Sequence, residues 1–235
     1  MRRDLLLWFA LACATAFAED PAMRPGREPL EKYQAYVRQA EARIQQEIQS
    51  PTYLWAARSP ARWERVRGGE AVVESWNAQG DSDIGDALIH DWIGACFIPG
   101  VKLTQVAAFL QNYAVHKNFY RPEVIESRLL EHDGDRYRLY YRLVKKKILT
   151  VVLDTEHTAT YYPISATRMV TSSYTTRIAE EKDGGVYIEC RTISLTRSVP
   201  YGLGWLINPI IRSLPSESLA HMLTATSEGV RSQAP

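Results

Sequence analysis

The chain has 235 residues, with 28 basic against 27 acidic side chains and 46% hydrophobic residues. This length can bury a substantial core and fits one domain with appendages. The near-zero net charge argues against a nucleic-acid partner, because such a partner requires a net basic surface.

The first 18 residues have the pattern of a secretory signal peptide. Arg2-Arg3 is a basic start, and residues 5–16 are apolar but too few to span a bilayer. Small residues then precede a cleavage point after Ala18. The alternative is lipoprotein processing at Cys13, although Ala stands where Leu is usual three residues earlier. The pattern predicts a protein that is secreted or periplasmic after cleavage near Ala18.

Residues 19–85 are predicted to form an N-terminal leader, an amphipathic helix and an irregular extension. Pro-rich residues 19–29 make the leader. From Leu30 to Ile48 the apolar residues recur every three or four positions, which predicts a helix that ends before Pro51. Its polar face is mixed in sign, which favours packing on its own domain over a role as a partner or membrane helix.

The extension at 51–85 is expected to be irregular apart from a short strand over residues 70–76. It carries Trp55, Trp63 and Trp76. Such residues either line the mouth of a ligand site or anchor loops onto the core, and the second role is the more common.

Residues 86–231 are predicted to form the main domain. A helix is expected over 103–113, and a closing helix over 203–230 is kinked or divided by Pro209 and Pro215, where Ser216 can cap the second segment. Six strands are predicted, over residues 88–98, 124–131, 137–144, 148–162, 168–180 and 186–197.

The strand at 137–144 has the clearest alternation. Tyr137, Leu139, Tyr141 and Leu143 share one face, and the other face is largely Arg. One covered face and one wet face are typical of an antiparallel sheet.

This order of elements resembles the helix-grip fold of the START-like superfamily, which includes lipid-transfer domains, birch-pollen-allergen-like proteins and polyketide cyclases. The resemblance covers residues 86–231, and the segments that prompt it are residues 89–100, 193–197 and 202–207. It implies an α+β fold in which a curved antiparallel sheet of six to seven strands wraps a long C-terminal helix, here with an extra N-terminal helix.

The number of strands departs from that fold, which normally has about seven. The turn at Lys182–Gly185 lies where another strand is expected. Either one long predicted strand is bent into two, or the sheet is a strand short and has an exposed edge.

The resemblance further implies a cavity between the sheet and the last helix, which binds or carries a hydrophobic or amphipathic small molecule or lipid. Hydroxyls among aromatic surface suit such a ligand, and they equally suit a filled core. The candidate ligand-binding residues are Tyr137, Leu139, Tyr141, Leu143, Trp205, Leu206, Ile210 and Met222.

Two other functions remain open. A cyclase or hydratase would need an acid–base residue in the same cavity, for which His90, His116, His157 and Glu189 are the possibilities. An interaction module would use the helix at 30–48 and the Trp-bearing extension. We predict no catalytic residue outright, because no G-x-S-x-G, H-E-x-x-H or phosphate-binding glycine motif is present.

No metal or cofactor is predicted either. Residues 154–157 have the composition of metal ligands, but on a strand their side chains alternate between faces. The basic run at 145–147 suggests a possible peripheral membrane contact or, more commonly, a solvated turn. Pairing of the first and last strands of the domain can place Cys96 opposite Cys190, with or without a disulfide.

Overall fold

The computed structural model shows one curved antiparallel sheet with helices on both of its faces. It describes residues 26–48, 50, 53–77, 81–146, 150–172, 175–181, 184–197 and 204–233, with the side chains of the last segment from Arg212 onward. The predicted signal peptide at 1–18 and the leader up to residue 25 lie outside these residues.

Within the described residues the sheet has nine strands in the order β1-β3-β9-β8-β7-β6-β5-β4, with β2 paired to β3. The strands are β1 (Val72–Ser75), β2 (Ser82–Asp83), β3 (Ala87–Pro99), β4 (Val124–Asp133), β5 (Arg136–Lys146), β6 (Thr150–Ser165), β7 (Arg168–Thr171), β8 (Thr175–Glu181) and β9 (Gly185–Arg197). β1 and β2 come from the predicted extension, which therefore adds to the same sheet.

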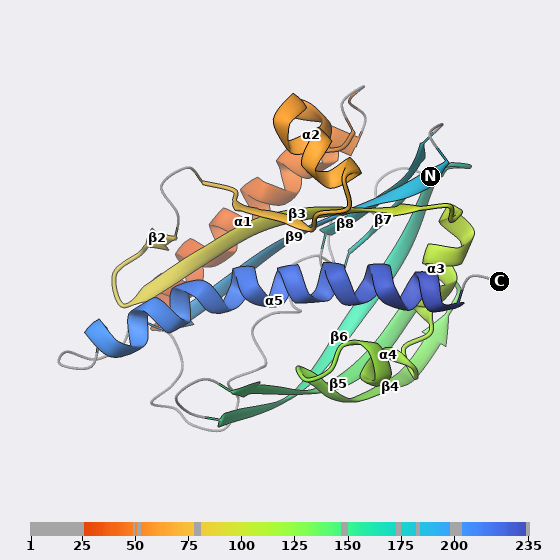
Figure 1. The fold of residues 1–235 in the computed structure, drawn as a ribbon. Helices are drawn as coiled ribbons and strands as arrows, with labels where there is room; N and C mark the ends of the chain where they lie inside the picture. Colours follow the sequence, from red (N-terminus) through yellow and green to blue (C-terminus); the bar gives the residue numbers. More distant parts are fainter. Residues whose placement is uncertain are drawn as a thin grey trace.

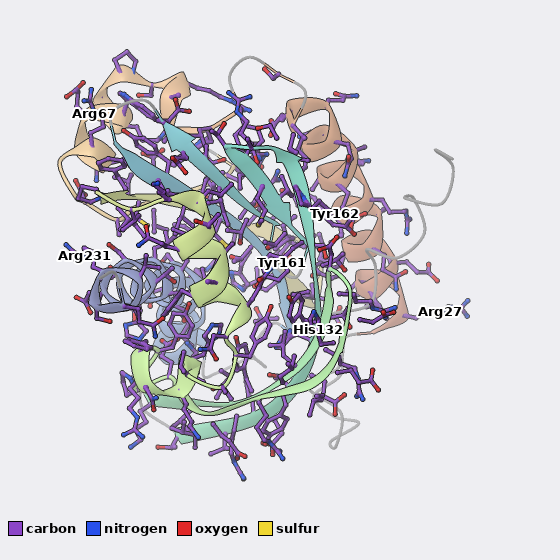
Figure 2. All side chains as sticks on the ribbon, turned by 90° about the vertical axis from the view of Figure 1, so that its right-hand side faces the viewer. Arg27, Arg67, His132, Tyr161, Tyr162 and Arg231 are labelled. Atoms are coloured by element: carbon purple, nitrogen blue, oxygen red, sulfur yellow. The ribbon has the colours of Figure 1, made fainter. Side chains whose placement is uncertain are left out.

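The helices cover the sheet from both sides (Figure 1). They are α1 (Arg27–Ile48), the 3-10 helix η2 (Ala56–Arg58), α2 (Pro60–Arg67), α3 (Leu103–Gln111), α4 (His116–Phe119) and α5 (Gly204–Gln233). The long α5 lies inside the curve of the sheet, and α1 lies on its outer side (Figure 2). This is the helix-grip arrangement that the resemblance to the START-like superfamily implies.

The strand that seemed to be missing lies upstream of the place where the sequence suggested it. Residues 168–180, predicted as one strand, form β7 and β8, which pair with each other. From residue 86 onward the described residues therefore supply seven strands. The alternative of a sheet one strand short is wrong, and Gly184, with φ +84°, belongs to a true turn between β8 and β9.

Two further predictions are corrected. The closing helix is not divided into two: α5 runs on through Pro209 and Pro215, and Ser216 donates to the carbonyl of Ser213 instead of capping a second segment. The extension is less irregular than predicted, because it contains η2, α2 and two strands. At the start of α2, Ser59 accepts a hydrogen bond from the Arg62 backbone and Pro60 occupies the first turn.

Alternation along β3 divides the interior into two cores. Cys96 and Ile98 pack with Leu223 of α5 on the concave face. Ile93 and Ala95 pack on the outer face. The outer core also takes in Ile44 and Ile48 of α1, so this helix packs on its own domain as its apolar stripe predicts.

The two cysteines lie on the concave face of neighbouring strands but are offset. Cys190 pairs with Gly94, whereas Cys96 pairs with Ile188. The expected opposition is therefore wrong by two residues, and both thiols are free. Burial raises the pKa of each thiol to about 12.

Candidate ligand-binding site

The four predicted residues of β5 share one face of the strand: Tyr141 and Leu143 pack on the core that includes α5, and Tyr137 and Leu139 pack with Tyr113 after α3. Tyr137 and Leu139 are buried, and Tyr141 and Leu143 are half-buried. Met222 of α5 is half-buried and packs against the same core as Tyr141 and Leu143. Five of the predicted residues thus lie around the concave face. The side chains of Trp205, Leu206 and Ile210 lie outside the described residues.

The sequence did not single out two further residues of this wall. Trp92 of β3 and Met169 of β7 are half-buried and pack against the concave core. Both faces of β3 are apolar, so alternation could not assign Trp92 to one of them. Its indole Nε1 is buried and has no hydrogen-bond partner among the described residues.

A hydrogen-bond chain fixes the orientation of Tyr141. The Nε2 of His116 lies 3.2 Å from the carbonyl oxygen of Phe109 and must donate to it. The Nδ1 of the same ring is then an acceptor, and the Tyr141 hydroxyl donates to it over 2.6 Å. Because α4 and the end of α3 supply the other members, the chain joins β5 to these helices.

A second hydrogen-bond chain also ends on a helix carbonyl. Tyr113 donates to the hydroxyl of Tyr161 over 2.8 Å, since Tyr161 itself donates to the Leu110 carbonyl over 3.0 Å. Figure 2 shows Tyr161 at the centre of the molecule.

The third chain ends on α5. Tyr120 donates to Thr226 over 2.9 Å, and Thr226 donates to the Met222 carbonyl over 2.7 Å. All three chains end on a helix carbonyl, so the hydroxyl protons of Tyr113, Tyr120 and Tyr141 are donated to protein acceptors.

His116, Tyr113 and Tyr120 are uncharged at neutral pH. Burial lowers the pKa of His116 to about 4, so its imidazole is neutral. Burial raises the pKa of Tyr113 to about 12 and that of Tyr120 beyond the physiological range. The part of the concave face around these residues therefore suits a neutral ligand surface.

Three of the four candidate acid–base residues lie on the concave face. The register places His90 on the same face of β3 as Trp92, and His157 opposite Leu139. His157 contacts the Thr155 hydroxyl over 3.0 Å, and His116 takes part in the chain described above. His90, His116 and His157 therefore remain candidate acid–base residues for the cyclase or hydratase alternative.

Glu189, the fourth candidate, lies on the opposite face, and its assignment to the cavity is wrong. Odd-numbered residues of β9 face α1, where Glu189 contacts Arg177 over 2.6 Å and accepts from the backbone of Ala56. Burial raises the pKa of Glu189, an effect that Arg177 opposes.

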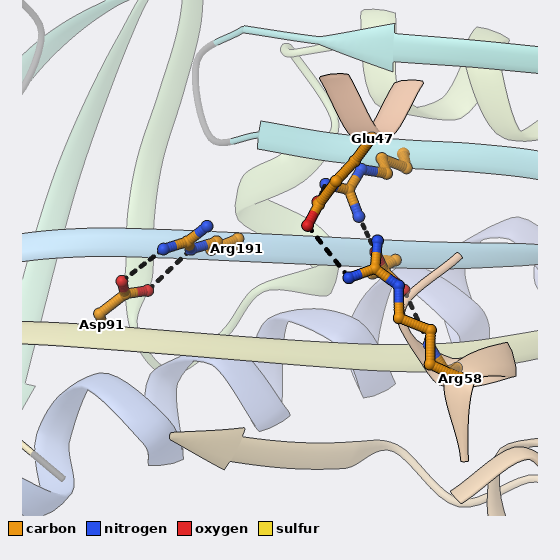
Figure 3. A network of polar contacts seen from close by, with 7 residues as sticks. Glu47, Arg58, Asp91 and Arg191 are labelled. Carbon is orange, nitrogen blue, oxygen red and sulfur yellow. Dashed lines mark hydrogen bonds and ion pairs between the residues drawn. The ribbon is translucent and has the colours of Figure 1, made fainter. Parts of the chain in front are cut away.

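These contacts belong to a charged network under α1 (Figure 3). Arg177 also contacts Glu47 of α1 over 2.6 Å, and Glu47 pairs with Arg58. Farther along the sheet Arg191 makes two hydrogen bonds to Asp91, of 2.9 and 2.6 Å. The network joins α1 to the outer face of the sheet.

Two other predicted features have definite surroundings. Lys145 pairs with Glu123 and donates to Ser218, so it is not a free cation for lipid heads. Lys147 lies outside the described residues. Within the described ranges, no group of three or more His, Cys, Asp or Glu could hold a metal ion. No described helix combines the length and apolar character needed to cross a bilayer.

No protein-family model matches this sequence, and no curated protein matches it significantly. Solved structures that are similar to it include human StAR-related lipid transfer protein 5, at 7% identity and TM-score 0.49, covering 85% of this chain and 98% of that one. A STAR-related lipid transfer protein from Xanthomonas axonopodis has 14% identity and TM-score 0.43, covering 68% and 98%. The Zhui aromatase/cyclase from Streptomyces has 6% identity and TM-score 0.47, covering 61% and 94%. At such identities the similarity concerns the fold alone.

Proposed function

We propose that the protein binds a neutral apolar or amphipathic small molecule or lipid between the concave face and α5. One observation carries this proposal. Trp92, Tyr141, Leu143, Met169 and Met222 remain half-buried although they lie on the inner side of the grip. In a core filled by protein, such side chains are normally buried completely.

The hydrogen-bond chains indicate which polar group the ligand carries. The hydroxyl protons of the wall are already donated to protein acceptors. Beside these chains a ligand carbonyl would find no uncommitted hydroxyl proton, whereas a ligand hydroxyl would find acceptors; the Trp92 indole N–H is a separate donor. The ligand class that fits best is an apolar molecule with a hydroxyl group.

Two measurements test binding. Native mass spectrometry and solvent extraction of the purified protein should recover an apolar molecule, and added ligand should raise the midpoint of thermal unfolding. In displacement of a fluorescent apolar probe, tetradecanol should compete about tenfold better than its methyl ether, because the ether lacks the donor. Repeated absence of any bound molecule, together with no thermal shift by either compound, would contradict the proposal.

A matched pair of variants locates the site. Leu143→Trp adds bulk on the concave face and should abolish probe binding. Val144→Trp adds the same bulk on the opposite face of β5 and should leave binding intact. Equal binding by both variants would place the ligand elsewhere.

We further propose that the protein acts after secretion, which the pattern of residues 1–18 supports. N-terminal sequencing of the protein from its native host should begin at Glu19. A lipidated Cys13, or an intact N-terminus, would contradict this proposal.

A further inference from the structure

Three polar side chains converge at one end of the concave face, near α5. The Oγ1 of Thr196 in β9 lies 2.6 Å from the Nε2 of His90 in β3. The Nδ1 of the same ring lies 2.8 Å from Oδ1 of Asp81, just before β2. His90 is fully buried, and the Asp81 side chain is 4% exposed. Three separate segments thus supply one contiguous set of a hydroxyl, an imidazole and a carboxylate.

The order of the groups assigns their protons. A carboxylate beside Nδ1 favours the tautomer with the proton on that nitrogen, which leaves Nε2 to accept from the Thr196 hydroxyl. This is the order of groups in hydrolases that use a hydroxyl nucleophile, a histidine base and an orienting acid. The Nδ1–Oδ1 contact is close but departs from hydrogen-bond alignment. Such contacts often tighten only when substrate binds.

The surroundings suit an acyl substrate. Thr196 is half-buried, so its hydroxyl is less enclosed than the two groups behind it. Arg212 of α5 lies 3.3 Å from the second oxygen of Asp81 and holds the carboxylate from its far side. Trp92 lies on the same face of β3, opposite Thr192, and its buried N–H has no partner among the described residues.

We propose that Thr196, His90 and Asp81 form an acyl-transfer site that hydrolyses an ester with an apolar acyl chain. The Thr196 oxygen attacks the ester carbonyl carbon while its proton passes to His90 Nε2. The carbon–oxygen bond to the alcohol then breaks, and His90 returns the proton to the leaving alcohol. Water, activated by the same nitrogen, hydrolyses the acyl-Thr196 bond and releases the carboxylic acid. Asp81 holds the ring and stabilises its positive charge.

This activity goes beyond the proposed binding function and uses a different part of the concave face from Leu143. Loss of probe binding in Leu143→Trp and loss of hydrolysis in the variants below are separate outcomes. Either proposal can therefore fail while the other stands.

The test uses the full chain and p-nitrophenyl esters with acyl chains of two to ten carbons. Wild-type protein should release p-nitrophenol above the rate in buffer. Thr196→Val removes only the hydroxyl and keeps a shape that strands accept, and it should lower the rate at least about 100-fold. Thr192→Val makes the same change four residues away on the same face and should retain the wild-type rate.

Further measurements separate catalysis from structure. The two Val variants should unfold at similar temperatures. His90→Gln should lower the rate as strongly as Thr196→Val, because it removes the base. A fluorophosphonate probe should add one mass increment to wild type and none to Thr196→Val. The proposal is overturned if wild type hydrolyses no ester of the series, or if Thr196→Val keeps its rate or its label.

Discussion

At the scale of single residues, the two faces of the sheet treat charge differently. The outer face buries Arg177, which contacts Glu47 and Glu189 and is 2% exposed. An exposed counterpart exists on β5, where Arg138 bridges Glu131 and Glu156 with 40% of its side chain exposed. Breaking a buried pair strands its partner charges in a low-dielectric interior, whereas exposed partners remain hydrated.

We therefore expect Arg177→Met to lower the free energy of unfolding by about 3 kcal/mol or more. Arg138→Met, which breaks the same number of ion pairs in water, should cost much less. Urea unfolding at neutral pH measures both values. Equal losses would contradict the expected difference between buried and exposed ion pairs.

The burial of His116 should make the stability of the fold depend on pH. Burial lowers its pKa from 6.5 to about 4, so the unfolded chain binds a proton more readily than the folded protein between these values. The contribution of neutral His116 to the free energy of unfolding is complete above pH 6.5, falls as the pH drops, and levels off below pH 4. Over this window, the shift corresponds to roughly 3 kcal/mol.

The measurement compares urea unfolding of wild type and His116→Gln from pH 7 to pH 4. The variant should be less stable at pH 7, since it loses the bond to Tyr141, and should lose less further stability on acidification. His132→Gln, at an exposed position, should lose as much stability between pH 7 and pH 4 as wild type. An equal loss in His116→Gln would show that His116 does not cause the dependence of stability on pH.

At the scale of elements, close packing holds the end of α5 against α3. A Cβ on Gly229 would lie 2.4 Å from the ring of Phe109, which is 1% exposed and cannot readily move. No larger residue fits here without displacing the Phe109 ring, although glycine has a low helix propensity.

Gly229→Ala should therefore lower the thermal midpoint, with an expected cost of about 1–3 kcal/mol for overpacking. Thr224→Ala, at an exposed position of the same helix, changes helix propensity without a contact and should be neutral or slightly stabilising. Calorimetry of both variants checks the pair, and a stabilised Gly229→Ala would show that the interface relaxes freely.

The elements also show where sequence reasoning succeeds. Period-two alternation located the concave face of β5, and three-four spacing located α1 and α3. Sequence reasoning missed the reversal of the chain between β7 and β8, because the five residues from Thr171 to Thr175 contain neither Gly nor Pro. It also placed Glu189 on the wrong face, because β9 is buried on both sides and alternation carries no polarity there.

At the scale of the whole molecule, the helix-grip order could be predicted, but most of the candidate site could not. The His116–Tyr141 contact joins residues 25 positions apart, and the His90–Thr196 contact joins residues 106 apart. Such pairs depend on sheet register and helix docking, which local patterns do not encode. Packing of α1 on its own domain was predictable from its stripe, whereas the face that it covers and the ion pairs beneath it were not.

The 16-residue strand β6 links the two halves of the sheet. Its residues 150–160 pair with β5, and its residues 161–165 pair with β7. The two ladders meet at Thr160 and Tyr161, where backbone hydrogen bonds run to both sides. Tyr161 donates to the carbonyl of Asp135 over 2.9 Å, and the carbonyl of Thr160 accepts from Ser172 over 3.1 Å. We therefore expect that any widening of the grip at this junction strains or breaks these bonds.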